Sequence, residues 1–468
     1  MRLHLSVLPV LLTLACTGNT PSASDDTDTV SPSDTDNPGQ TSDIYAPDNG
    51  PTHEGGTRVP VDSETDILAA IAAASPGDVI TIEPGEYDFN QLIRVTADGT
   101  AAERIFLRAE TLGDVTLNLR HIENFKIYGK YWIFENLVVR GACTSNTSCE
   151  HAFHIVGDAD DLIFRTNEVV DFASHVKLNG EVVDSGPAKA FPDRIMFIEN
   201  LWYNTKYVAN NAPHNVLNLD GGKSHVVRGN IFGDYGAPAS LPKSASAVYP
   251  KASTLGMLVE QNLIVCEKNL GNGETVRGIQ LGDGAPASIC DGDDDQDGIG
   301  DCIENGQNQE ALIRNNVILN CDNGGSSAGI MVSSDRESKI LHNTVLSTGK
   351  RSGAFYVGHP DHDTYWNSNL LENGFNTDYA KRTLVESDNA IVDATTAASL
   401  FTDPRMGNLA IEDSRPLSER VTTSADAPWD FCGHPRGETA DLGAIEYSAT
   451  EQQAECFLRV QEMFDRLP

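Results

Sequence analysis

Short apolar runs interrupted by an asparagine recur along most of this chain. In Met257–Cys266, MLVEQNLIVC, an apolar run leads through two polar residues to Asn262, and a second apolar run follows. Seven other stretches repeat the pattern around Asn136, Asn167, Asn200, Asn230, Asn316, Asn343 and Asn369. The intervals between these asparagines are 31, 33, 30, 32, 54, 27 and 26 residues, and we expect the interval of 54 to hold two periods, the second with an insertion. A period of this size is typical of stacked repeats.

The residues inside each repeat favour strands. They are short runs of Val, Ile, Phe and Leu bounded by Gly, Asn, Asp and Ser, and ten-residue helical patterns are almost absent. A coil of about 30 residues built from short strands and turns predicts an all-β fold, the parallel β-helix, whose coils stack at ~4.8 Å. We expect each asparagine at a corner, where it can adopt a left-handed conformation and bond to the asparagine one coil away.

The first strands resemble a known superfamily. The stretch Ser75–Phe89, SPGDVITIEPGEYDF, is followed by Gly99-Thr100 and by IFLRAE. This order is similar to the first coil of the right-handed β-helix superfamily, which includes pectate lyases and the alginate lyase/chondroitinase B group. Over residues 60–447 the resemblance implies a right-handed parallel β-helix. It does not define an activity, because the superfamily also contains hydrolases, epimerases and proteins that are not enzymes.

The two ends of the chain predict export and a surface anchor. Residues 1–16 have a basic start and an apolar run too short to span a bilayer, which is typical of a signal peptide. Their last residues, TLAC, resemble a bacterial lipobox, which implies acylation of Cys16 and an outer-membrane or cell-surface lipoprotein; the alternative is an ordinary secretory signal. Residues 17–58 are polar and predict a solvated tether.

The domain boundaries follow from these ends. We expect the β-helix over residues 59–447, with a helix over Ser63–Ala74 that caps its first coil, and a helical tail over 448–468. The stretch Asp430–Tyr447 resembles the closing coil of many surface β-helix proteins, and we expect its Arg436 to bridge carboxylates.

Nine cysteines minus Cys16 leave eight, an even number in an exported protein. We predict the pairs Cys143–Cys149, Cys266–Cys321, Cys290–Cys302 and Cys432–Cys456, although eight cysteines allow 105 connectivities. The formal net charge of −35 repels nucleic acid and anionic lipid headgroups, and this argues against both as partners. The charge also argues against a polyanionic ligand, unless cations bridge the protein and the ligand. Adaptation to a saline habitat is an alternative explanation of the acidity. We expect a monomer.

One acidic insertion, residues 283–306, predicts a calcium site. Its stretch CDGDDDQDGIGDCIE has the carboxylate spacing of an EF-hand loop, and DDDQDGIGDC resembles a thrombospondin type 3 calcium repeat. The predicted ligands are Asp293, Asp295, Asp297, Asp301 and Glu304. Five carboxylates would fill most of the coordination sphere of a divalent ion and leave little room for a substrate. We therefore expect the calcium to order the insertion. The alternative is a solvated acidic loop.

Polar side chains alternate with apolar ones on several predicted strands. In SHVKLNG, Val176 and Leu178 point inward and the polar residues between them point outward, and NVLNLD repeats this arrangement. The predicted glycan-binding residues are His175, Asn179, Asn218, Asp220 and Gln280. The alternative is an ordinary hydrated sheet face.

The same face raises the question of catalysis. β-Elimination of a uronate needs a base and cationic charge, and the chondroitinase B group uses a Lys and an Arg about one coil apart with a nearby Ca²⁺. Lys177, Lys251 and Arg277 are the candidate catalytic residues, and Lys251 and Arg277 are 26 residues apart. The stretch before Lys251 lacks a Glu to hold the ion, and Arg277 shares the parity of inward residues. We therefore predict a surface protein that binds extracellular polysaccharide or serves in the envelope without catalysis, with a uronate lyase as the alternative.

Overall fold

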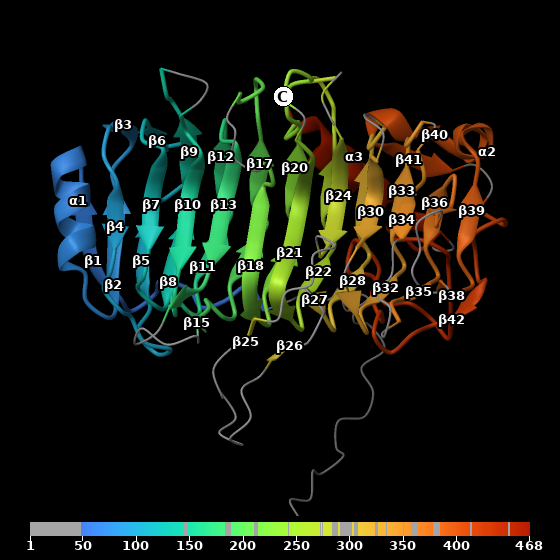
Figure 1. Cartoon of the computed structure of the whole chain (residues 1–468), viewed down its shortest axis with the longest axis horizontal. Helices are drawn as coiled ribbons and strands as arrows, with labels where there is room; N and C mark the ends of the chain where they lie inside the picture. Colours follow the sequence, from blue (N-terminus) through green and yellow to red (C-terminus); the bar gives the residue numbers. More distant parts are fainter. Residues whose placement is uncertain are drawn as a thin grey trace, which may run out of the picture. The chain divides into compact units, whose positions relative to one another are not determined.

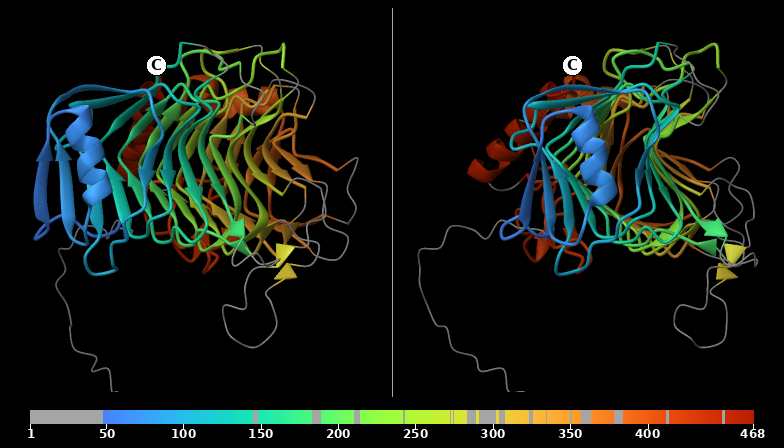
Figure 2. Two further views of the ribbon diagram at one scale, coloured as in Figure 1. Left: turned by 60° about the vertical axis from the view of Figure 1, so that its left-hand side comes forward. Right: turned by 90° about the vertical axis from the view of Figure 1, so that its left-hand side faces the viewer.

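A computed structural model describes residues 48–144, 148–182, 189–209, 214–241, 243–271, 273, 275–282, 289–290, 302–303, 308–322, 326–333, 335–349, 351–356, 363–377, 384–411, 414–447 and 450–468. Within these residues most strands form three long parallel sheets that run side by side along the molecule (Figure 1). Viewed along the long axis, the strands superimpose into the walls of a tube (Figure 2). The prediction of a parallel β-helix is therefore confirmed.

Sheet A holds the first strand of each coil. Its strands are β1 (Thr57–Val61), β2 (Asp78–Ile82), β5 (Ile105–Arg108), β8 (Trp132–Glu135), β11 (Ile163–Arg165), β16 (Met196–Ile198), β19 (Val226–Arg228), β22 (Leu258–Glu260), β28 (Leu312–Arg314), β32 (Lys339–Leu341), β35 (Tyr365–Asn367) and β38 (Val385–Ser387).

Sheet B follows sheet A in each coil after one tight corner. Its strands are β3 (Gly85–Phe89), β6 (Val115–Leu119), β9 (Val138–Gly141), β12 (Glu168–Val170), β17 (Leu201–Tyr203), β20 (Ile231–Gly233), β23 (Leu263–Val265), β29 (Val317–Leu319), β33 (Thr344–Leu346), β36 (Leu370–Glu372) and β39 (Ala390–Val392).

Sheet C completes the coil. Its strands are β4 (Ile93–Val95), β7 (Glu123–Ile127), β10 (His151–Val156), β13 (Ser174–Asn179), β18 (Leu217–Lys223), β21 (Ala245–Leu255), β24 (Val276–Leu281), β30 (Ala328–Val332), β34 (Ala354–Tyr356) and β37 (Phe375–Asn376). Two short strands, β27 (Asn308–Gln309) and β31 (Asp335–Arg336), pair beside it.

Antiparallel pairs lie outside these sheets. They are β14 (Glu181–Val182) with β15 (Lys189–Ala190), β25 (Ile289–Cys290) with β26 (Cys302–Ile303), β40 (Phe401–Asp403) with β41 (Asn408–Ile411), and β42 (Val421–Thr422) with β43 (Thr439–Ala440). The short helices α2 (Ala394–Leu400) and η1 (Pro404–Met406) follow the last strand of sheet B.

A column of asparagines, all buried except the half-buried Asn389, runs along the corner between sheets A and B. The side chain of each donates from Nδ2 to Oδ1 of the next at 2.9–3.0 Å. The column consists of Asn167, Asn200, Asn230, Asn262, Asn316, Asn343, Asn369 and Asn389. The predicted stacking of repeat asparagines is therefore confirmed from Asn167 onward, and Asn389 adds a coil that the sequence did not indicate.

Three details of the predicted column were wrong. The residue before each asparagine takes the left-handed conformation, as Glu199 does at φ 54°, so the asparagine is free to point inward. Asn136 is itself such a residue, at φ 58°, and Leu137 stands beside Asn167 in the column. Asn262 bonds directly to Asn316 at 2.9 Å, so the interval of 54 residues is one coil with a long insertion and not two periods.

The interior of the tube is apolar and rich in aromatic rings. Phe134, Phe164 and Phe197 stack on successive coils with ring centroids 4.9 and 5.3 Å apart. Trp202 and Phe232 stack in the same way at 6.4 Å. Such stacks follow from the parallel register, because one coil places each side chain directly above its equivalent in the coil before.

Helices and disulfides secure the ends. Helix α1 (Glu64–Ala73) covers the first coil, as predicted (Figure 2). Its N-cap is Ser63, whose side chain accepts from the backbone N–H of Asp66. Helix α3 (Thr450–Asp465) packs on sheet B, where Leu467 lies against Gly233 and Lys268 Nζ donates to Leu467 O at 2.5 Å. The pairs Cys143–Cys149, Cys266–Cys321 and Cys432–Cys456 are disulfide-bonded, as predicted. Cys290 and Cys302 are backbone register partners in the β25–β26 pair, and the disulfide between them stays a prediction.

The C-terminal segment folds back on the asparagine corner. Arg436 contacts Glu446 and donates to Asn315 Oδ1 at 3.0 Å, so among the described residues it joins one carboxylate to an amide of the asparagine corner and does not bridge two carboxylates as expected. Asn315 in turn donates to Trp429 O at 2.6 Å, and Gly443 N donates to Ser368 O at 2.9 Å. The segment therefore covers corner residues of several coils.

Candidate functional site

The register of sheet C brings polar residues of three coils together on its outer face. Lys177 pairs with Asn218 and Asn179 with Asp220, and Asp220 pairs in turn with Lys251. Leu178, Leu219 and Pro250, the residues between them, form the inward row. Because side chains alternate across a strand, the predicted grouping of Lys177, Asn218, Asp220 and Lys251 on one face is what the structure has.

Asp220 lies between two ammonium groups. Lys177 Nζ contacts Asp220 Oδ2, and Lys251 Nζ lies 3.3 Å from Asp220 Oδ1 and 4.8 Å from the ring centre of Tyr249. The three charged side chains keep 18–20% of their surface exposed. They are thus fixed by one another and remain accessible from outside.

Irregular backbone follows both Asp220 and Lys251. Gly221 and Gly222 have φ of 97° and 91°, and a side chain at Gly221 would meet the Phe191 ring at 2.3 Å. Ala252 and Ser253 have φ of 51° and 81°, and the register between β18 and β21 shifts by one residue here. Bulges next to binding sites commonly redirect a side chain, and this one ends the regular strand directly after the two charged residues.

Asn218 lies beneath this charged group and is fully buried. Neither its Nδ2 nor its Oδ1 has a hydrogen-bond partner among the residues that the structure describes. An unsatisfied buried polar atom costs about 1–3 kcal/mol, so native proteins rarely keep two in one side chain without a use.

His154 extends the site toward the N-terminal coils. It pairs in register with Lys177, its Nε2 lies 2.8 Å from Asn179 Oδ1, and its Nδ1 lies 3.1 Å from Glu123 Oε1. Burial lowers the pKa of His154, so the imidazole is neutral at neutral pH. Lys126 stands next in the same row, in register with His154 and 3.8 Å from Glu123.

Sequence reasoning missed His154, Glu123 and Tyr249. The strand HAFHIV, which alternates His154 with Phe153 and Ile155, carries the same signal as SHVKLNG and could have indicated His154. The role of Tyr249 depends on the register with Lys177 and Asn218, which only the stacked coils reveal.

Three predicted residues do not join this group. His175 is fully buried, its Nε2 lies 3.2 Å from Tyr203 O, and its ring contacts Trp202, so burial lowers its pKa to about 4. Arg277 and Gln280 are buried farther along sheet C, where Arg277 Nη1 donates to Gln280 Oε1 at 2.7 Å. The alternation of side chains along the strand predicted that His175 points outward, and this prediction was wrong. His175 is the second residue of β13, directly after the turn from sheet B, and its ring points inward.

The predicted calcium ligands Asp293, Asp295, Asp297, Asp301 and Glu304, and the predicted lipidation site Cys16, lie outside the described residues. Within the described part of the chain no group of three or more His, Cys, Asp or Glu side chains is arranged to hold a metal ion. None of the described helices is long and apolar enough to cross a bilayer. The three disulfides are typical of an extracellular protein.

Comparisons with known proteins bear on the fold. Neither a family model nor a curated protein matches the sequence. Among solved structures, the pectate lyase Pel9A is 14% identical over 81% of this chain and 90% of its own, with a TM-score of 0.51. The chain shares its fold with this pectate lyase.

An alginate lyase from Paenibacillus sp. str. FPU-7 is 15% identical over 72% of this chain and 99% of its own, with a TM-score of 0.48. A rhamnogalacturonan lyase is 14% identical over 83% and 92%, with a TM-score of 0.41. At such identities the similarity of this parallel β-helix to the pectate lyase concerns architecture.

Proposed function

We propose that the protein binds an extracellular polysaccharide on the outer face of sheet C, around Asn218, Asp220 and the two lysines. The main support for this proposal is Asn218. Its side-chain amide is buried, and within the described chain neither the Nδ2 donor nor the Oδ1 acceptor has a hydrogen-bond partner. A sugar hydroxyl group, or a water that a sugar displaces, can satisfy both. The pectate lyase of the same fold supports a polysaccharide as the ligand.

The charges around the site favour a hydroxyl-rich ligand over a densely charged one. Three carboxylates, Glu123, Glu150 and Asp220, accompany three ammonium groups, Lys126, Lys177 and Lys251. The site therefore has little net charge, and the chain as a whole carries −35. Tyr249, over which Lys251 lies, adds an aromatic ring at the same position along the tube.

Affinity electrophoresis in gels that contain neutral or acidic polysaccharides tests this proposal. We expect retardation in at least one gel, and we expect Lys251→Met and Asp220→Asn to weaken the binding at least tenfold. Lys339→Met is the matched control, since Lys339 is exposed on sheet A and pairs with Asp426 at 2.6 Å. Equal retardation of all variants, or none in any gel, would contradict the proposed site.

β-Elimination of a uronate is the second candidate, and His154 favours it. A neutral imidazole beside Lys177 can accept the α-proton once a ligand displaces Asn179 from Nε2, while the two ammonium groups stabilise the enolate charge. Lys177 and Lys251 fit the role of charge stabilisation, because both ammonium groups lie beside Asp220 on the accessible face of sheet C. Ultraviolet absorbance of unsaturated products on alginate, pectate and glycosaminoglycans tests this reaction. His154→Gln should lower any activity by ~100-fold or more, as loss of a general base does.

We further propose that the protein is held at the cell surface by a lipid on Cys16. The lipobox-like TLAC and the polar tether of residues 17–58 support this anchor. Labelling with a radioactive fatty acid should be lost in Cys16→Ser, while the variant should still be exported.

A further inference from the structure

The residue that precedes each position of the asparagine column belongs to a row of its own along the corner. Every member of this row has a left-handed backbone, with φ between 51° and 65°. We call this set the corner row. It consists of Asn136, Thr166, Glu199, Gly229, Gln261, Asn315, His342 and Ser368, one residue on each of eight successive coils.

On the last four of these coils the C-terminal segment covers the corner row. Gln261 Nε2 donates to Asp430 O at 2.9 Å, and Asn315 Nδ2 donates to Trp429 O at 2.6 Å. His342 contacts a backbone carbonyl of the same segment at 3.2 Å. All four row residues on these coils are buried to 6% exposure or less. This part of the corner row therefore holds an extended chain by polar contacts.

On the first four coils the described chain leaves the corner row accessible. Asn136, Thr166 and Gly229 are half-buried, Glu199 is exposed, and together they form the floor of a groove of about 470 Å³. The Thr166 hydroxyl donates to Asn136 Oδ1 at 2.6 Å, and Glu199 Oε1 lies 3.4 Å from Asn49 Nδ2. Three steps between coils make this floor ~14 Å long. The groove therefore suits a linear ligand that lies along the tube.

One side of helix α3 forms the wall of the groove (Figure 2). Arg459, Met463 and Arg466 line it, at intervals of four and three residues that place them on one side of a helix. Arg466 follows the last residue of α3, and its N–H still donates to Glu462 O at 3.1 Å, so the helical spacing extends to it. Seven residues separate the two arginines, or ~10 Å along a helix.

Neither arginine of the wall pairs with a carboxylate among the described side chains. Glu455 and Glu462 precede Arg459 and Arg466 by four residues, a spacing at which such side chains commonly pair, yet neither ion pair is formed within the described chain. Arg459 Nη1 donates instead to Cys432 O at 3.3 Å. Both guanidinium groups thus border the groove with donors available to an anionic ligand.

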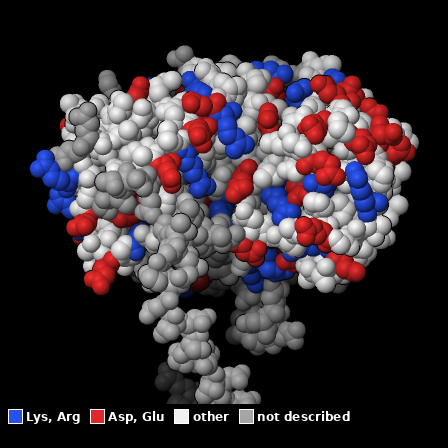
Figure 3. Space-filling view, turned by 180° about the vertical axis from the view of Figure 1, so that it is seen from behind, with Lys and Arg blue, Asp and Glu red and all other residues white. Residues whose placement is uncertain are grey.

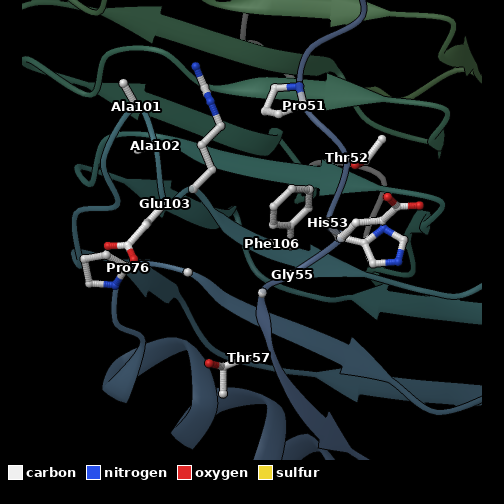
Figure 4. A pocket seen from close by; sticks show the side chains of 14 residues that line it. Pro51, Thr52, His53, Gly55, Thr57, Pro76, Ala101, Ala102, Glu103 and Phe106 are labelled. Carbon is white, nitrogen blue, oxygen red and sulfur yellow. The ribbon is translucent and has the colours of Figure 1, made fainter.

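A second pocket shows how the groove differs in charge. Figure 4 shows this pocket of about 330 Å³, where the chain from Pro51 to Thr57 passes beside Phe106. Its lining includes Glu54 and Glu103 as well as Arg104, so it has no excess of positive charge. The groove beside α3 has two guanidinium groups and one carboxylate, and this local excess of positive charge occurs in a chain that carries −35.

We propose that the groove beside α3 binds an acidic polysaccharide, as a second site across the tube from sheet C. The two guanidinium groups pair with carboxylate or sulfate groups about 10 Å apart, and Thr166 and Glu199 bind hydroxyl groups between them. A linear acidic polysaccharide carries both kinds of group at regular intervals. The accessible part of the corner row then holds a ligand much as the covered part holds the C-terminal segment.

Fluorescence anisotropy with labelled oligomers of polygalacturonate and of heparin tests this site. The full chain carries Lys251→Met in all samples, so that the proposed site on sheet C does not contribute. We expect at least one oligomer to bind, and Arg459→Gln/Arg466→Gln should weaken that binding at least tenfold. Arg420→Gln is the matched control, because Arg420 is also exposed and also donates to a backbone carbonyl, that of Arg415 at 2.9 Å.

A variant of the floor separates contact with the ligand from damage to the fold. Glu199→Gln keeps an acceptor for hydroxyl groups but removes a negative charge, so it should strengthen binding at least twofold. Damage to the fold would instead weaken binding. Lack of binding to both oligomers, or equal affinity of the double arginine variant, would overturn the proposal. Polyglutamate that binds as tightly as the oligomers would also overturn it, since the partner would then be an acidic peptide.

Discussion

At the residue scale, Asn218 is costly for folding, and we have proposed that it contacts a ligand. Its amide is buried beneath Asp220 and Lys251 with no hydrogen-bond partner within the described chain. An apolar side chain of similar size would avoid the cost of about 1–3 kcal/mol for each unsatisfied group. A residue kept in spite of such a cost is a good candidate for contact with a ligand.

We therefore predict that Asn218→Leu is at least as stable as the unmodified protein but binds polysaccharide at least tenfold more weakly. Thermal unfolding and affinity electrophoresis measure the two effects separately. A variant that loses stability by more than about 1 kcal/mol would show that Asn218 is satisfied within the fold, against our reading.

Glu267 shows how one buried carboxyl group makes stability depend on pH. Burial raises its pKa to about 8, and the nearby Asp322 and Asp234 add to the effect. The folded chain therefore keeps a proton that the unfolded chain releases near pH 4.5. Stability from this group is present at low pH and is lost as the pH rises from about 4.5 to about 8.

We predict that Glu267→Gln is more stable than the unmodified protein above pH 8, by about 1–2 kcal/mol after allowance for solvent screening. At pH 5 the two proteins should be equally stable, because Gln resembles the protonated carboxyl group. Urea unfolding at the two pH values measures the difference. An equal gain at both would mean that packing, and not ionisation, is responsible.

At the element scale, the coil between Asn262 and Asn316 carries the largest insertion that we recognise, and a disulfide closes it. Cys266–Cys321 joins positions 55 residues apart, whereas Cys143–Cys149 joins positions 6 apart. In the chain-entropy model the longer loop gives a stabilisation of about 4 kcal/mol and the shorter one about 2 kcal/mol.

Replacement of Cys266 and Cys321 by alanine should therefore lower the melting temperature more than replacement of Cys143 and Cys149. Differential scanning calorimetry of the two double variants makes the comparison. The opposite order would mean that strain or residual structure in the unfolded chain outweighs loop closure.

The same insertion contains the predicted calcium loop. We propose that Asp293, Asp295, Asp297, Asp301 and Glu304 bind one Ca²⁺, in keeping with their spacing. Titration calorimetry should then show one site, which Asp295→Ala/Asp297→Ala abolishes. The double variant should keep the melting temperature of the solenoid, since the coils on either side are joined by Asn262 and Asn316. Heat of binding that is unchanged in the variant would contradict these ligands.

The period of the repeats predicted the fold well because each coil repeats one physical task. An apolar run must face the core and an asparagine must reach the next coil, so both leave a regular trace in the sequence. The register around Asn136 was misjudged because Leu137 fills the column position there. The interval of 54 was misjudged because an insertion can lengthen a turn without altering the ladder.

The candidate site was only partly predictable for a different reason. Alternation along a strand places Lys177, Asn218, Asp220 and Lys251 outside, and this requires no knowledge of neighbouring coils. Contacts such as those of Asp220 with both lysines, or of His154 with Asn179, depend on the register between coils. A short strand in the sequence does not determine that register.

At the scale of the whole molecule, acidic charge dominates. The chain carries a formal charge of −35, and basic side chains are interspersed among acidic ones on the side seen in Figure 3. Buried pairs such as Arg108–Glu135, at 2.6 Å, are shielded from salt, whereas the excess surface carboxylates repel one another.

We predict that the melting temperature rises between about 0.1 and 1 M sodium chloride, as the screening length falls from ~10 to ~3 Å. Sucrose at equal osmolarity is the control, because it favours the folded state without screening charge. If the rise in salt does not exceed that in sucrose, self-repulsion is not a significant cost for this protein.

In the asparagine column, the stacking of two coils does not depend on the length of the turns between them. Asn262 and Asn316 meet as closely as Asn316 and Asn343, although twice as many residues lie between the first two as between the second. New material can therefore enter the stretch between β24 and β27 while the neighbouring strands keep their partners. Such a scaffold can acquire a different recognition loop in a single step, and it offers a natural position at which a foreign peptide could be displayed.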